Sequence, residues 1–186
     1  MRKQPLIITV AALVLLAGVA YLAGSINTDK DGADASKSQN NLSTYIHSDI
    51  GFSFNYPKDY SIKEEKDNLP ADNIINVYIS RTNQTGDPVS VSVYRNIEKL
   101  DIEAFLLKQK NSGVILLDSL LTTGDFSGES KRAVTIDEQT GVQYQDETSS
   151  QRNLFLQNGD YVYVISEQSV FGSNSNYNLI IDSFNK

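Results

Sequence analysis

Cysteine and tryptophan are absent from the 186-residue chain, and histidine occurs once, at His47. Without cysteine the chain has no disulfides, thiolate metal sites or thiol nucleophiles. Any histidine-based triad would have to centre on His47. Its neighbours Ser48 and Asp49 do not indicate a triad, because adjacent side chains of a strand point to opposite faces. We therefore interpret His47 as a surface or turn histidine.

Motifs for the common catalytic chemistries are also missing. The sequence contains no Gly-x-Ser-x-Gly nucleophile elbow, no Ser-x-x-Lys string and no Gly-x-Gly or Walker phosphate loop. The sequence therefore gives no catalytic residue, no cofactor-binding residue and no metal ligand. We expect a protein that is not an enzyme and that needs no cofactor.

Adjacent carboxylates occur at three places, Glu64-Glu65, Asp137-Glu138 and Asp146-Glu147. A glycosidase would need two acids that face one cleft. Neighbouring acids on strands or turns are usually solvated, and we interpret these pairs in that way. Ten tyrosines could form a sugar- or protein-binding face, but we expect most of them to be half-buried residues of a sheet.

Charge is distributed unevenly along the chain. The whole chain has a formal charge of -7, whereas residues 44–186 carry 12 basic and 20 acidic side chains, a net charge of -8. An acidic domain repels phosphate backbones and anionic lipid headgroups. We therefore expect no nucleic-acid partner and no docking on a lipid surface.

An apolar segment without a charge runs over residues 6–23, LIITVAALVLLAGVAYLA. As a helix it would be about 27 Å long, close to the thickness of a bilayer core. Arg2 and Lys3 precede it and acidic residues follow, so the positive-inside rule places residues 1–5 in the cytoplasm. We predict a single-pass anchor in the cell membrane with an extracytoplasmic C-terminal domain. The alternative is a cleaved signal peptide.

Residues 24–43 are rich in Gly, Ser, Asn, Asp, Lys and Gln, a composition typical of a flexible linker. Within them, residues 27–32 (NTDKDG) resemble the first half of an EF-hand calcium loop. The second half does not match, because Asp34 replaces an apolar residue and Ser38 replaces the bidentate glutamate. We interpret the string as a solvated tether.

Residues 44–186 form the predicted globular domain, and its first half shows strand patterns. Tyr45 and Ile46 open it, and apolar residues alternate with polar ones over residues 52–56, 75–79 and 89–93. The last two runs flank a turn cluster and predict an antiparallel hairpin. Short strands are also predicted at residues 133–136 and 142–144.

Helix signals and one strong turn signal complete the pattern. Asp101 can cap a helix from Ile102, with Gly113 as a stop, whereas residues 114–121 fit either a helix or a strand. Asn158-Gly159 predicts a hairpin with a type I′ turn, followed by a strand that is apolar on both faces. An apolar stripe then marks a last helix, at Tyr177, Ile180, Ile181 and Phe184. The expected class is α+β, an antiparallel sheet with helices packed on it.

Two strings resemble the PsbP-like domain family, named after the extrinsic P subunit of photosystem II. Residues 51–60, GFSFNYPKDY, resemble the family's opening motif, with Tyr60 in place of the commoner tryptophan, and residues 179–184, LIIDSF, resemble its closing helix. The resemblance covers residues 44–186. It implies an antiparallel sheet between helical layers, an α/β/α sandwich, in an accessory or binding subunit without catalysis. Family members serve as photosystem assembly factors, and a small Ran-binding import factor shares the fold.

These observations favour a membrane-tethered accessory or binding module that faces outward and has an envelope or membrane protein as its partner. One alternative is an exported carboxylate-dependent hydrolase. Another is an envelope sensor domain. The photosynthetic members lack such a membrane anchor, so we expect a membrane-anchored bacterial relative instead.

Overall fold

Most strands of the domain follow the alternation of apolar and polar residues in the sequence. The computed structural model describes residues 41–82, 89–117, 120, 125–127, 129–146, 151–167 and 175–186. In chain order the elements are β1 (Leu42–His47), β2 (Phe52–Pro57), β3 (Tyr60–Glu65), β4 (Asn73–Arg81), β5 (Val89–Arg95), α3 (Ile102–Asn111), β6 (Glu129–Ile136), β7 (Gln139–Asp146), β8 (Arg152–Asn158), β9 (Tyr161–Glu167) and α5 (Ser175–Ser183).

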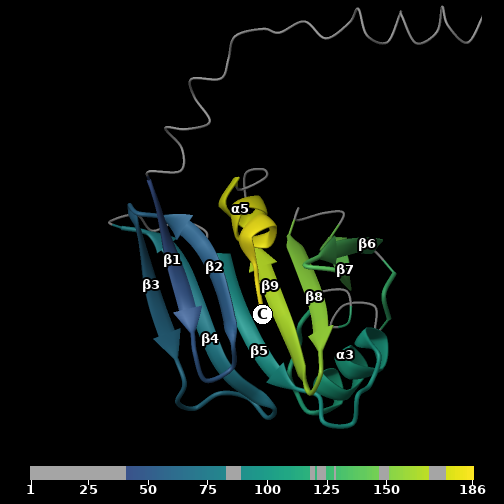
Figure 1. Ribbon diagram of the computed structural model, residues 1–186. Helices are drawn as coiled ribbons and strands as arrows, with labels where there is room; N and C mark the ends of the chain where they lie inside the picture. The colour runs from purple at the N-terminus through teal and green to yellow at the C-terminus, as the bar shows by residue number, and fades with distance from the viewer. Residues whose placement is uncertain are drawn as a thin grey trace, which may run out of the picture. The chain divides into compact units, whose positions relative to one another are not determined.

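A seven-stranded antiparallel sheet forms the centre of the domain, with the strand order β3-β4-β5-β9-β8-β7-β6 (Figure 1). The predicted hairpin of β4 and β5 is confirmed, with Val77 opposite Val91. Strand β9 lies in the middle of the sheet, and residues 162–165 are buried, as the run of apolar residues on both faces predicts. Strands β3 and β6 are the two edges.

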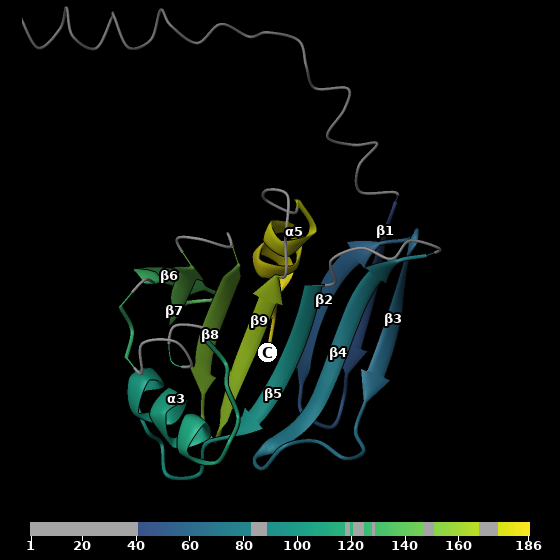
Figure 2. The same cartoon turned by 180° about the vertical axis from the view of Figure 1, so that it is seen from behind.

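Different elements cover the two faces of the sheet. On one face, α5 and the β1–β2 hairpin pack on the inward residues of β4, β5 and β9, including Val77, Val91 and Ile165. On the other face, Phe105 and Leu106 of α3 pack against Val162 and Val164 of β9. Figures 1 and 2 show α5 and α3 on opposite sides of the sheet. The expected antiparallel sheet with packed helices is therefore confirmed.

Helix α3 begins and ends where the sequence predicts. The Asp101 side chain accepts a hydrogen bond of 2.8 Å from the Ala104 N–H, the bond of an N-cap. The helix ends at Asn111, and Gly113 follows with φ +84°, a conformation that glycine adopts without strain. In the ambiguous segment 114–121, residues 114–117 belong to neither a helix nor a strand.

The predicted hairpin at Asn158-Gly159 is present, but its turn differs from the prediction. Asn158 pairs with Tyr161, so Gly159 and Asp160 are the two loop residues. Only Gly159 has a positive φ, +58°, whereas a type I′ turn needs positive values at both positions. Glycine at the first loop position is the pattern of a type II′ turn. The type I′ prediction is wrong because Asn158 belongs to the strand.

The two strings that carry the family resemblance lie against each other. The rings of Phe52 and Phe184 have centroids 5.9 Å apart. Ser53 and Asn185 exchange two backbone hydrogen bonds of 2.7 and 2.9 Å. The Asn55 N–H donates to Ser183 Oγ at 2.8 Å. These strings therefore fasten the β1–β2 hairpin to the C-terminal helix.

Some features differ from the sequence-based expectations or lie beyond the described residues. Strand β1 begins at Leu42, so Leu42 and Ser43 belong to the β1–β2 hairpin and not to the linker. Strand β3, a polar edge strand, has no clear signal in the sequence. The predicted membrane helix, residues 6–23, and the calcium-like string, residues 27–32, lie outside the described residues. Within the residues that the structure does describe, no helix is long and apolar enough to cross a membrane.

Candidate functional site

The β6–β7 hairpin forms one end of the seven-stranded sheet. Its register is continuous from Glu129 opposite Asp146 to Ile136 opposite Gln139. Asp137 and Glu138 form the two-residue loop and have φ values of +46° and +62°. Positive values at both positions are those of a type I′ turn, which matches the twist of the strands. The second acidic pair of the sequence is therefore a hairpin turn.

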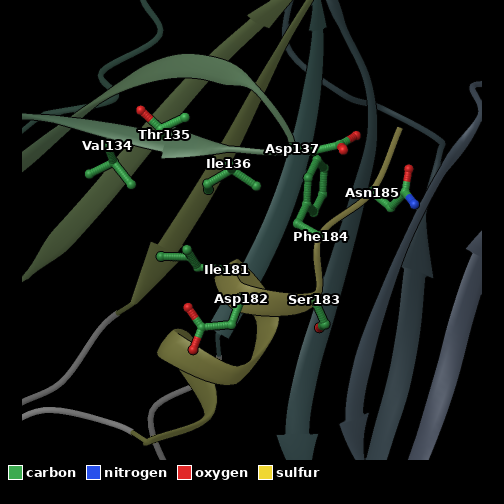
Figure 3. A pocket seen from close by; sticks show the side chains of 9 residues that line it. All are labelled: Val134, Thr135, Ile136, Asp137, Ile181, Asp182, Ser183, Phe184 and Asn185. Atoms are coloured by element: carbon green, nitrogen blue, oxygen red, sulfur yellow. The ribbon is translucent and has the colours of Figure 1, made fainter. Parts of the chain in front are cut away.

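A hollow lies beside this hairpin on the face that carries α5. We call it the α5-side hollow; its volume is about 470 Å³ and its lining residues are Val134, Thr135, Ile136, Asp137, Ile181, Asp182, Ser183, Phe184 and Asn185. Figure 3 shows β6 on one side of this hollow and the end of α5 on the other. Its lining is mixed, with apolar side chains such as Ile136 and Ile181 beside polar ones such as Thr135, and it includes two exposed carboxylates, Asp137 and Asp182.

A second hollow lies on the opposite face of the same hairpin, beside the first turn of α3. We call it the α3-side hollow; its volume is about 380 Å³ and its lining residues are Asp101, Ile102, Glu103, Lys131, Thr140, Val142, Tyr144 and Gln157. The Glu103 carboxylate accepts hydrogen bonds from the Lys131 ammonium and, at 3.3 Å, from the Tyr144 hydroxyl. The bond to Glu103 raises the pKa of Lys131, and burial raises the pKa of Tyr144.

Gly141 of β7 lets the neighbouring strand approach the hairpin closely. A Cβ atom at this position would lie 2.5 Å from Leu156 Cδ2, 2.7 Å from the Phe155 carbonyl oxygen and 3.2 Å from Leu154 Cδ1. Two leucine side chains of β8 therefore occupy the space above this residue. The position requires glycine because of this packing.

A buried ion pair lies beneath α5, near the hairpin. The Arg152 guanidinium donates to Glu167 Oε2 at 2.7 Å, and the two side chains are 12% and 1% exposed. The guanidinium also lies 4.3 Å from the ring centroid of Tyr177. Burial raises the pKa of Tyr177, and its hydroxyl has no hydrogen-bond partner among the described residues. This cluster is enclosed by packing and holds α5 on the sheet.

The surface alternative for His47 is wrong, because the side chain is buried. The turn alternative is right. His47 ends β1 and stacks on Phe52, with ring centroids 5.5 Å apart. Its Nδ1 accepts a hydrogen bond of 3.3 Å from the Ile50 N–H across the turn. Ser48 donates to Asp49 instead of to His47. The histidine therefore closes a turn, and the three neighbours do not form a triad.

The other acidic pairs do not converge on a cleft either. Glu64 accepts hydrogen bonds from Tyr45 and Lys66, both at 2.8 Å, and these bonds lower its pKa, with Lys66 the larger cause. Glu65 accepts from Tyr78 at 3.2 Å. Asp146 ends β7, and Glu147 lies outside the described residues.

Tyrosines and metal ligands complete the comparison with the sequence. All nine tyrosines in the described part of the chain are buried or partly buried, as expected for residues of a sheet. The same residues contain no group of three His, Cys, Asp or Glu side chains that could hold a metal ion. The two hollows have no signal in the sequence, because strands and helices from distant segments line each of them.

Comparison with known proteins identifies the fold. No protein-family model matches the sequence, and no curated protein is a significant sequence relative. The chain is similar to the solution structure of cyanobacterial PsbP (CyanoP) from Synechocystis sp. PCC 6803, with a TM-score of 0.52 and 12% sequence identity. The match covers 78% of this chain and 92% of that one. The predicted resemblance is thus confirmed at the level of the fold, which is PsbP-like.

Proposed function

We propose that this protein is a binding or accessory module without catalytic activity. Residues 6–23 anchor it in the cell membrane, residues 24–41 tether it, and the domain faces outward. Its partner is an envelope or membrane protein. The β6–β7 end of the sheet is the binding surface.

One observation carries this proposal: an edge strand of the sheet is flanked by a hollow on each face. The hollows of about 470 and 380 Å³ lie on opposite sides of the same hairpin. Several other ionisable side chains form ion pairs, such as Arg81 with Asp59 and Lys108 with Glu98. A sheet edge that is flanked by two hollows is suited to binding a protein segment.

The tether adds a physical reason for a binding role. A flexible linker of about 20 residues has a mean end-to-end distance of roughly 25 Å. Anchoring on such a linker raises the concentration of the domain around proteins in the same membrane. A modest affinity for a neighbour is then sufficient. The resemblance of residues 51–60 and 179–184 to the PsbP-like domain family also implies an accessory or binding subunit.

A carboxylate-dependent hydrolase is the second candidate, because Asp137 and Asp182 both line the α5-side hollow. Hydrolases of this kind place two acids on either side of a substrate. Both of these side chains are exposed to water, however. A carboxyl group that acts as a general acid at neutral pH is usually shielded from water. This difference favours binding over catalysis.

The decisive experiment combines function in the cell with partner capture. The double variant Asp137→Asn/Asp182→Asn and the control Asp49→Asn/Asp67→Asn are each introduced into a deletion strain. A photo-crosslinking residue at Thr135 reports capture of the partner. Binding predicts that the first variant loses complementation and crosslinking together, and that the control keeps both. Loss of complementation with unchanged crosslinking would instead support the hydrolase.

Protease added to spheroplasts tests the location. We expect it to degrade the domain while a cytoplasmic marker stays intact. A protected domain would contradict the orientation. A soluble mature chain that begins near Tyr21 or Ile26 would contradict the anchor and support a cleaved signal peptide.

A further inference from the structure

We propose that the outer edge of β6 binds an extended segment of the partner protein as an additional strand of the sheet, with a lysine or arginine side chain of that segment in the α5-side hollow. This inference rests on the proposed binding function and specifies its mode and the chemistry of the partner. The backbone of β6 provides the affinity, and the two hollows provide the selectivity.

The first step concerns the edge itself. Strand β6 is the last strand of the sheet, and no strand of the described residues pairs with its outer side. Its pairing with β7 has no register shift over eight residues, and its sequence contains no proline. Natural edge strands are usually shortened, bulged, interrupted by proline or charged, because a long regular edge attracts other strands. Strand β6 carries charges at Glu129, Lys131 and Arg132, but it is not shortened, bulged or interrupted by proline. Strand β6 has kept a regular edge.

The opposite edge of the sheet is less suitable. Strand β3 is two residues shorter than β6, and three of its six residues are charged, against three of eight in β6. The Tyr45 hydroxyl of β1 donates to Glu64 of β3 at 2.8 Å, which places a second hairpin beside this edge. The hollows also lie at the β6 end. Among the two edges, β6 therefore has the features of a docking strand.

The second step concerns the side chains of an added strand, which must alternate between the two faces. On β6, Val134 and Ile136 point to the face of α5 and line one hollow, whereas Lys131 lines the other. Ala133 lies on the same face as Lys131 and has only a methyl group. Side chains on one face of an added strand therefore reach the α5-side hollow. Those on the other face reach the α3-side hollow, because the small side chain of Ala133 leaves room for them.

The third step concerns charge. Neither Asp137 nor Asp182 forms a hydrogen bond or an ion pair with another described residue. The Lys186 ammonium is attracted electrostatically to the Asp137 carboxylate but forms no hydrogen bond with a described residue. The lining beside these carboxylates is mixed, with apolar side chains such as Ile136 and Ile181 next to polar ones such as Thr135. Lysine and arginine side chains combine an apolar stem with a cationic end, so they fit this lining.

A second copy of the chain fits less well than a basic segment. Antiparallel self-pairing centred on Ala133 would place Arg132 of each copy diagonally across from the other on the same face. Like charges at adjacent positions of paired strands repel. The charge of β6 therefore disfavours a dimer through this edge, and the oligomeric state of the free chain provides a test.

The experiment uses the full-length chain in detergent micelles and a displayed library of nine-residue peptides as the probe. Enriched peptides are synthesised in two forms, one with N-methyl groups on the odd-numbered residues and one with them on the even-numbered residues. Each form therefore has the hydrogen-bonding groups of one peptide edge blocked and those of the other edge free. Addition to a strand requires only one peptide edge. We expect one methylated form to lose binding and the other to keep it, with slowed amide hydrogen exchange over residues 129–136.

A matched pair of variants tests the charge. Asp137→Asn/Asp182→Lys and the control Asp49→Asn/Asp67→Lys change the net charge by the same amount. Asparagine tolerates the positive φ of residue 137, so the hairpin stays folded. We expect enriched peptides to contain lysine or arginine and to bind the first variant at least about tenfold more weakly, whereas the control binds normally.

Several results would overturn the inference and leave the proposed function standing. They are enrichment of peptides without basic residues, equal binding of both methylated forms, or protection at a site other than β6. A dimer of the free chain that pairs through β6 would also overturn it. No enrichment at all would refute strand addition. Failure of the complementation and crosslinking experiment would refute the binding function itself.

Discussion

The turn between β6 and β7 allows a sharp prediction, because glutamate occupies a backbone conformation that favours glycine. Glu138 has φ +62° in the second position of a type I′ turn. Non-glycine residues other than Asn and Asp adopt this region at a cost of about 1–2 kcal/mol. Glycine removes the cost, but it loses about 0.4–1 kcal/mol through the greater freedom of the unfolded chain. Glu138→Gly should therefore stabilise the domain by about 0.5–1 kcal/mol.

The comparison with Glu138→Ala isolates the backbone effect. Alanine removes the carboxylate but keeps the left-handed strain, so any effect of charge appears in both variants. At an ordinary position with negative φ, alanine is more stable than glycine by about 0.5–1 kcal/mol. We expect the opposite order here. The sign of the difference between the two variants therefore decides the question.

Thermal unfolding of the full-length chain in micelles, followed by near-UV circular dichroism, measures this difference. One kcal/mol corresponds to a change in Tm of roughly 3 °C for a domain of this size. We expect Glu138→Gly to melt about 2–3 °C above Glu138→Ala. A lower Tm for the glycine variant would show that residue 138 does not hold a positive φ and would refute the type I′ turn.

Three further predictions concern packing, the buried ion pair and pH. Gly141→Ala should destabilise the domain by about 1–3 kcal/mol in urea unfolding, because its Cβ would overlap the Phe155 carbonyl; a neutral result would contradict the close approach of β8. Glu167→Gln should cost about 3–5 kcal/mol by leaving Arg152 buried without its counter-charge, and recovery in a Glu167→Leu/Arg152→Met double variant is the matched check. Burial raises the pKa of Tyr94 to about 12, whereas tyrosine of the unfolded chain ionises near pH 10. The free energy of unfolding should therefore keep its full value below about pH 10 and fall as the pH rises to about 12. Tyr94→Phe should make this fall shallower.

Local signals predicted the elements that depend on neighbouring residues. The Asp101 cap, the alternation of Val89, Val91 and Val93, and the stripe on α5 each follow from a period or a cap that a short segment contains. Even the error at Asn158-Gly159 was small, because the hairpin was right and only the two loop residues were displaced by one. That displacement depends on the pairing register, which both strands set together.

Features that join distant segments could not be predicted in this way. Strand β5 pairs with β9, and no local pattern indicates that partner. The burial of His47 depends on Phe52 in the next strand. The α5-side hollow is lined by residues 134–137 and 181–185, which are distant in the sequence, so no local pattern indicates it. The pattern of β6 is mostly polar, so only its second half was predicted as a strand.

The fold and the proposed binding surface meet in α5, and they use different residues of the same short string. Ile180 and Phe184 are buried in the core shared with the β1–β2 hairpin, so they fix the position of the helix. Asp182 is exposed at the margin of the α5-side hollow. Packing therefore constrains where this hollow lies, whereas the charge at its margin can change without loss of the core. Under the proposed function, the domain keeps its PsbP-like architecture while exposed residues such as Asp137 and Asp182 determine which partner it binds.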